Sequence, residues 1–85
     1  MNSFSFTLFA KKNFVRLEED VQERIVAKLK EMKTHQHIEA VLKPLTDFGP
    51  ATHRLRIGDY RVIVQRISKT DFLIIDVDHR RNVYR

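Results

Sequence analysis

The stretch of sequence that decides the fold is residues 53–64, which read HRLRIGDYRVIV. Apolar and polar residues alternate on both sides of Gly58-Asp59, and β-branched and aromatic residues are frequent in the second half, as is typical of half-buried strands. A Gly-Asp pair is suited to a two-residue connection between such strands. The segment therefore predicts a β-hairpin.

The hairpin also predicts which side chains share a face of the sheet. With a two-residue turn, Arg56 lies opposite Arg61 and Leu55 lies opposite Val62, and opposed residues point to the same side. The side expected to face the rest of the fold carries Leu55, Ile57, Tyr60, Val62 and Val64. The reverse side is expected to carry Arg54, Arg56 and Arg61.

Arginines directly opposite one another repel, at a cost of about 0.2–1 kcal/mol, so this cluster needs a partner of opposite charge. One interpretation is an ordinary surface ion-pair network with Asp76 and Asp78, at alternate positions of the following strand. The other is a phosphate site, in which a rigid sheet presents guanidinium groups to a nucleic-acid backbone. The two interpretations are compatible, because a carboxylate orients an arginine without using all of its donors.

The flanking segments complete the predicted fold. Residues 72–78 are apolar enough for another strand after a polar turn, and residues 4–8 alternate as a first strand does. From Lys11 the apolar period changes to three and four, which indicates a short helix and then a longer one that ends near Lys33. Asp20 is expected to cap the second helix, with Glu23 at the capping-box distance. The apolar stripe of the two helices contains Phe14, Leu17, Val21, Ile25, Leu29 and Met32.

We therefore expect one α+β domain over residues 1–85. Its order is β-α-α-β-β-β, with a small antiparallel β-sheet of about four strands and an N-terminal α-hairpin packed on one face. Residues 34–52 are expected to form a packed connection with a short amphipathic turn.

Composition excludes several classes of site. The chain of 85 residues contains no cysteine, which excludes disulfides, thiolate metal sites and a cysteine nucleophile. Its two glycines, Gly49 and Gly58, form no phosphate-binding loop motif. His35 and His37 lack a third ligand at a suitable spacing, so neither a metal nor another cofactor is expected. We expect no membrane span and no signal peptide, and a cytoplasmic protein.

The net charge of +5 is concentrated near the C-terminus. Seven of the nine arginines lie after residue 51, and arginine presents a planar fork of donors that suits phosphate. Residues 77–85, VDHRRNVYR, add an imidazole, further guanidiniums and a phenol. Cleavage of RNA without a metal requires such groups, to orient the 2′-hydroxyl, neutralise the phosphate and protonate the departing 5′-oxygen. The alternatives are a solvated basic face, a locally hydrogen-bonded His79, and a Tyr84 that packs on the core or stacks on a base.

These segments resemble a known family. Residues 53–64 are similar to the "yRlRvGdYRviy" hairpin of the RelE/ParE toxin superfamily, and residues 77–84 are similar to its closing "VgHRrdvY". The resemblance implies a compact α+β toxin of a type II toxin–antitoxin system, inhibited by a cognate antitoxin. It further implies a RelE-like endoribonuclease that cuts mRNA in the ribosomal A site without a metal.

The resemblance also implies roles for individual residues. Catalytic positions fall on Arg54, Arg61, Arg80, Tyr84 and His79. RNA-binding positions fall on Arg56, Arg81 and Arg85. Thr52 stands where the RelE-type nucleases carry another basic residue, and Asp78 replaces a glycine of the motif. Two alternatives stay open: a ParE-like toxin that binds DNA gyrase without nuclease activity, and an inactive remnant whose partner is an antitoxin.

Overall fold

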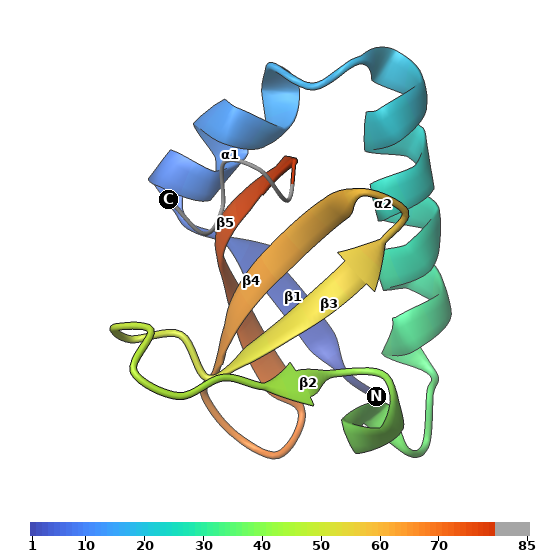
Figure 1. The fold of residues 1–85 in the computed structure, drawn as a ribbon. Helices are drawn as coiled ribbons and strands as arrows, with labels where there is room; N and C mark the ends of the chain where they lie inside the picture. The colour runs from blue at the N-terminus through green and yellow to red at the C-terminus, as the bar shows by residue number, and fades with distance from the viewer. Residues whose placement is uncertain (80–85) are drawn as a thin grey trace.

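A computed structural model describes residues 1–79 of the chain and shows an α+β fold, as predicted (Figure 1). The elements follow the predicted order β-α-α-β-β-β, with one short strand added. In chain order they are β1 (Ser3–Phe6), α1 (Leu8–Val15), α2 (Glu19–Lys33), the 3₁₀ turn η1 (Ile38–Ala40), β2 (Lys43–Pro44), β3 (His53–Ile57), β4 (Tyr60–Arg66) and β5 (Asp71–His79).

The sheet has five strands in the order β1-β5-β4-β3-β2, rather than about four. The additional strand is β2, whose two residues pair antiparallel with β3. The sheet is also mixed, because β1 runs parallel to β5. Helices and the hairpin separate these two strands in sequence, so no tight turn forces them to be antiparallel. Two residues are too few to show an alternating pattern, which is why the sequence did not reveal β2.

Two details of the predicted helices are wrong. Helix α1 begins at Leu8, because the Thr7 side chain accepts a hydrogen bond from the Ala10 amide at 3.0 Å. Leu8 is therefore an exposed helical residue and not the last inward residue of a strand. Helix α2 begins one residue before Asp20, after Glu18, so Asp20 lies in its first turn and is not the cap. There its charge still favours the helix, because the N-terminal end carries a partial positive charge.

The helices cover one face of the sheet and form the main core with it (Figure 1). Helix α2 ends at Lys33 as predicted, and its apolar stripe is buried. The aromatic rings of Phe4 and Phe72 stack at 5.1 Å between the centroids and join β1 to β5. The sheet contributes to this core Leu55, Val62, Val64, Phe72, Ile74 and Val77. The apolar side of the hairpin therefore faces the helices, as predicted. Within the described residues no helix is long and apolar enough to cross a membrane.

A second, smaller core covers one end of the reverse face. The connection between β2 and β3 folds back so that Leu45, Phe48 and Ala51 pack with Ile63 and Ile75. Positive φ angles at Asp47 (54°) and Gly49 (62°) allow this reversal, and both residue types tolerate that conformation. The connection is thus packed, as expected, and covers only part of the reverse face.

The main core predicts a difference between two adjacent residues of α2. Ile25 is fully buried, whereas Val26 is 39% exposed. Replacing Ile25 by alanine leaves a cavity, so Ile25→Ala should lower the free energy of unfolding by about 2–5 kcal/mol. The matched control Val26→Ala should change it by less than about 1 kcal/mol. Urea unfolding followed by circular dichroism measures both, and equal losses would contradict this packing.

Candidate nucleic-acid interface

The β3–β4 hairpin has the predicted register. Arg56 pairs with Arg61 and Leu55 pairs with Val62. Gly58, the first residue of the turn, has a φ of +60°, which favours glycine and suits a turn that follows the twist of the strands. The register therefore places Arg54, Arg56 and Arg61 together on the face opposite the helices.

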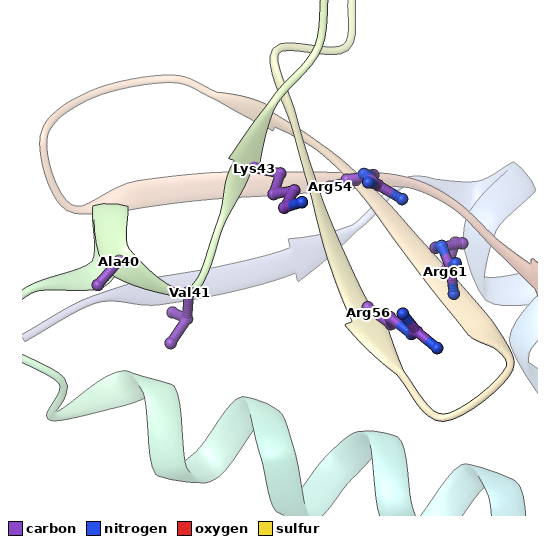
Figure 2. A pocket seen from close by; sticks show the side chains of 6 residues that line it. All are labelled: Ala40, Val41, Lys43, Arg54, Arg56 and Arg61. Atoms are coloured by element: carbon purple, nitrogen blue, oxygen red, sulfur yellow. The ribbon is translucent and has the colours of Figure 1, made fainter.

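These arginines line a pocket of about 220 Å³. Figure 2 shows the side chains of Lys43, Arg54, Arg56 and Arg61 beside one another over β2, β3 and β4. Ala40 and Val41, between η1 and β2, line the same pocket. Among the described residues that line it there is no carboxylate, so the pocket is suited to an anion.

Sequence reasoning missed Lys43 as a site residue. It lies directly opposite Arg54 across β2 and β3, and its residue is exposed. The only local signal was its position before Pro44 in the segment that precedes the hairpin. The place of this segment in the sheet follows only from the pairing of β2 with β3.

Arg61 is the most unusual residue of the pocket, because it is a charged side chain that is only 6% exposed. Its Nε is buried and has no hydrogen-bond partner among the described residues. Its Nη1 donates to the Tyr60 carbonyl at a long 3.4 Å. A buried donor without an acceptor is unfavourable for the folded state. Arg56 is exposed and its Nε donates to the Gly58 carbonyl at 3.3 Å.

The two carboxylates proposed as partners of the arginines lie in different surroundings. Asp76 accepts a hydrogen bond from the Asn13 side chain of α1 at 2.8 Å, and another from the Val77 amide. The pairing of β4 with β5 shifts by one residue next to Asp76, which changes the direction of the strand there. Within residues 1–79 Asp76 therefore forms no ion pair with the arginines, contrary to the first interpretation. Asp78 does lie opposite Arg61.

His79 is not brought to the arginine cluster. It pairs with Tyr60, and the two rings meet edge to face at 5.4 Å. Tyr60 packs against the helix-side core, so His79 is on the side of the sheet away from the pocket. The other predicted site residues, Arg80, Arg81, Tyr84 and Arg85, lie outside the described residues. In the described part of the chain no cluster of three metal-ligating side chains is present.

Arg66, the fourth arginine of the hairpin, has a structural role. Its guanidinium forms an ion pair with Glu39 at 2.9 Å and donates to the carbonyls of Ser68 and Lys69. It also lies over the Phe72 ring, 5.3 Å from the centroid. A backbone hydrogen bond to the Glu39 carboxylate, and after it the hydrogen bond from Arg66, hold the pKa of Glu39 below its usual value. Arg66 thus joins η1 to the β4–β5 turn.

The Thr52 hydroxyl lies next to Arg66. The Thr52 Oγ1 accepts a hydrogen bond from the Arg66 amide at 2.7 Å and lies 2.8 Å from the His53 Nδ1. The Thr52 side chain therefore satisfies a backbone amide at the end of β4. Partial burial of His53, reinforced by the positive charge of Arg66, lowers the pKa of its imidazole.

Comparison with solved structures identifies the class of fold. The chain superimposes on one chain of the intact RelBE toxin–antitoxin complex of Escherichia coli with a TM-score of 0.70 and 23% identity, over 93% of this chain and 96% of that chain. A chain of the RelB–RelE antitoxin–toxin complex of Methanococcus jannaschii matches with a TM-score of 0.70 and 18% identity, over 93% of each of the two chains. A chain of the RelBE2 toxin–antitoxin complex of Mycobacterium tuberculosis matches with a TM-score of 0.63 and 28% identity, over 93% of this chain and 98% of that chain. No protein-family model and no curated protein sequence matches the chain.

The protein thus has a RelE-like toxin fold, as the resemblance implied. The isolated E. coli RelE toxin is also similar to it, with a TM-score of 0.71 and 23% identity over 93% of this chain. The fold is shared even though fewer than a third of the residues are identical.

The buried charge of Arg61 predicts that this residue lowers stability. Arg61→Met keeps most of the apolar side-chain volume and removes an unsatisfied buried donor from a group of like charges. We expect the free energy of unfolding to rise by about 1 kcal/mol or more. The matched control Arg56→Met, at an exposed position, should change it by less than about 0.5 kcal/mol. Denaturant unfolding at low salt measures both, and a destabilised Arg61→Met would contradict this account.

The lowered pKa of His53 predicts a dependence of stability on pH. The unfolded chain takes up a proton near the ordinary value of 6.5, whereas the folded protein does so at lower pH. The stability that His53 contributes is therefore present above pH 6.5 and lost as the pH falls through the folded pKa. An NMR titration should place the imidazole midpoint below 6.5, and His53→Gln should weaken the fall in stability below that pH. A midpoint at or above 6.5 would contradict the prediction.

Proposed function

We propose that this chain is the toxin of a toxin–antitoxin pair and that it cleaves mRNA on the ribosome without a metal. The observation that carries the proposal is the cationic pocket, in which the buried Arg61 has an Nε without a hydrogen-bond partner among the described residues. The RelE-like fold supports the same conclusion. A purely structural surface has little reason to bury a charged group at a cost in stability.

The proposed reaction is internal transfer of the phosphodiester. The 2′-hydroxyl gives up its proton to water as its oxygen attacks the adjacent phosphorus, the bond from phosphorus to the 5′-oxygen breaks to leave a 2′,3′-cyclic phosphate, and the 5′-oxygen takes up a proton. Negative charge that builds on the phosphate during the attack is stabilised by Arg61 and Arg54. These groups are already positioned by the sheet, so little reorganisation is needed as the charge develops.

The remaining roles come from the end of the chain. Arg80 follows directly on the last residue of β5, and we assign to it a further contact with the phosphate. Tyr84 stacks on a base or supplies the proton to the 5′-oxygen. Arg56, Arg81 and Arg85 bind the RNA backbone. His79 has the weakest support as a catalytic residue, because its ring packs on Tyr60.

We also propose a cognate antitoxin as the partner of this chain. The matching structures from E. coli, M. jannaschii and M. tuberculosis are toxin–antitoxin complexes. A simple mode of inhibition is to cover the cationic pocket, since every step of the proposed reaction needs access to it.

Translation in vitro with primer extension tests the proposed activity. Cuts within ribosome-bound message, which disappear when the antitoxin is added, are expected. Intact message together with inhibited supercoiling by DNA gyrase would instead indicate the ParE-like activity. Neither effect, with retained antitoxin binding, would indicate an inactive remnant.

Removal of the proposed phosphate and base contacts should abolish toxicity. We expect Arg61→Ala to slow cleavage by about 10²–10³-fold, as loss of a donor to a developing anion typically does. The double variant Arg61→Ala, Tyr84→Ala should cause no growth arrest while still binding the antitoxin. Arg16→Ala, at an exposed position just after α1, is the matched control and should stay toxic. A double variant as toxic as the parent would exclude catalysis at this face.

A further inference from the structure

The exposed apolar side chains of the described residues gather on the two helices. Six large apolar residues within residues 1–79 are exposed, and four of them belong to α1 or α2, namely Leu8, Phe9, Val15 and Val26. Leu8 and Val15 are seven residues apart, so both lie on one side of α1. Exposed apolar groups that cluster in this way are typical of a surface that binds another molecule.

Two adjoining hollows give this surface its shape. One, of about 370 Å³, is lined by Phe6, Lys11, Phe14 and Val15. The other, of about 460 Å³, is lined by Phe14 and by one stripe of α2 that includes Glu19, Glu23 and Val26. Phe14 lines both hollows, so they form one continuous surface, which we call the helical surface. Figure 1 shows that the two helices lie on the same side of the sheet.

The two helices carry opposite charges around the apolar centre of this surface. Helix α1 has the exposed lysines Lys11 and Lys12 and no acidic residue. Helix α2 has Glu19 and Asp20 in its first turn, and Glu23 follows one turn later. Among the described residues, Lys11, Lys12, Glu19 and Glu23 form no ion pair. The opposite charges of the two helices are therefore not neutralised by one another within one chain.

A surface with a basic half, an apolar centre and an acidic half is complementary to itself. A rotation of 180° about an axis through the centre places the basic half of one copy on the acidic half of the other. The reverse contact forms at the same time, as in any two-fold interface. A uniformly acidic or basic partner would instead meet a like charge on one of the two halves. The charge pattern therefore favours a second copy of this chain as the occupant.

We infer that the chain forms a two-fold dimer through its helical surface, with α1 of each protomer on the N-terminal half of α2 of the other. Phe14, Val15 and Val26 form the apolar centre, and the lysines of α1 pair with the glutamates of α2 around it. The cationic pocket is built on β2, β3 and β4, and its arginines lie on the face of the sheet opposite the helices. Dimerisation leaves that pocket outside the interface, so the inference does not depend on the proposed function.

Sedimentation equilibrium of the purified chain tests the inference. The mass should rise from that of one chain to that of two as the concentration increases, and the dimer should weaken at high salt because exposed charges are screened. Val15→Ser should weaken the dimer by about threefold or more, since it removes apolar area from the centre. The matched control Ile67→Ser lies between β4 and β5 at nearly equal exposure, 59% against 58%, and should leave the dimer unchanged.

Reversal of the charges identifies the contact itself. The variant Lys11→Glu, Lys12→Glu has two acidic halves, and the variant Glu19→Lys, Glu23→Lys carries added lysines on both helices. Neither should form a dimer, because like charges then face one another. An equimolar mixture of the two should form a heterodimer, because each α1 again meets an α2 of opposite charge. All four positions are exposed, so circular dichroism should show that both variants are folded.

The outcomes that would overturn the inference are specific. One is a wild-type chain that stays monomeric up to about 1 mM, including the case in which an antitoxin covers the helices instead. Another is a dimer that both charge variants preserve, or that the mixture of the two fails to restore, because the contact would then lie elsewhere. A monomer that cuts message would contradict the dimer and leave the nuclease proposal intact. A dimer with the expected charge dependence that does not cut message would contradict only the nuclease proposal.

Discussion

The pairing of β3 with β4 is the constraint on which the rest of this structure depends. In a β-strand successive side chains point to opposite faces, so a shift of one residue would exchange the two faces of the hairpin. Leu55 and Val62 would leave the core and the arginines would enter it. The turn at Gly58 prevents this shift, because its positive φ sets where the chain reverses. One register therefore determines both the core and the cationic pocket.

The two faces of the sheet have different energetic roles. The helix-side face buries large apolar side chains such as Ile25 and Phe72, and this burial is the main favourable contribution to folding. The reverse face brings like charges together and buries the guanidinium of Arg61, which is unfavourable without an anion. The helix-side core offsets that cost. Such a division is expected where a small domain keeps a strained or repulsive group for function.

The similarity to RelE structures at 18–28% identity has a physical explanation. A core requires apolar side chains of suitable volume at the inward positions, and many sequences satisfy that requirement. Function depends instead on specific groups at a site. The pocket must therefore be judged on its own residues, and one residue that lines it, Lys43 on β2, lies in a segment with a weak local signal.

What the sequence determined by itself came from local periodicity. The alternation in residues 53–64 predicted the hairpin, its register and its arginine face, and the period of three and four predicted helix α2 and its end at Lys33. These features repeat over several residues, so the pattern is clear within one segment. The position of Leu8 was predicted wrongly, because a single capping hydrogen bond from the Ala10 amide to the Thr7 side chain outweighed a short alternation.

Only the tertiary structure decided which distant residues meet. The sequence did not indicate that β2 pairs with β3 and brings Lys43 to Arg54. Nor did it indicate that Asn13 of α1 binds Asp76, or that His79 packs on Tyr60 away from the pocket. Each of these contacts joins segments far apart in the chain and depends on a shift in strand pairing or on how helix and sheet pack. The apolar period of a segment predicts its secondary structure and which of its side chains are buried, but it does not identify the segment against which they pack.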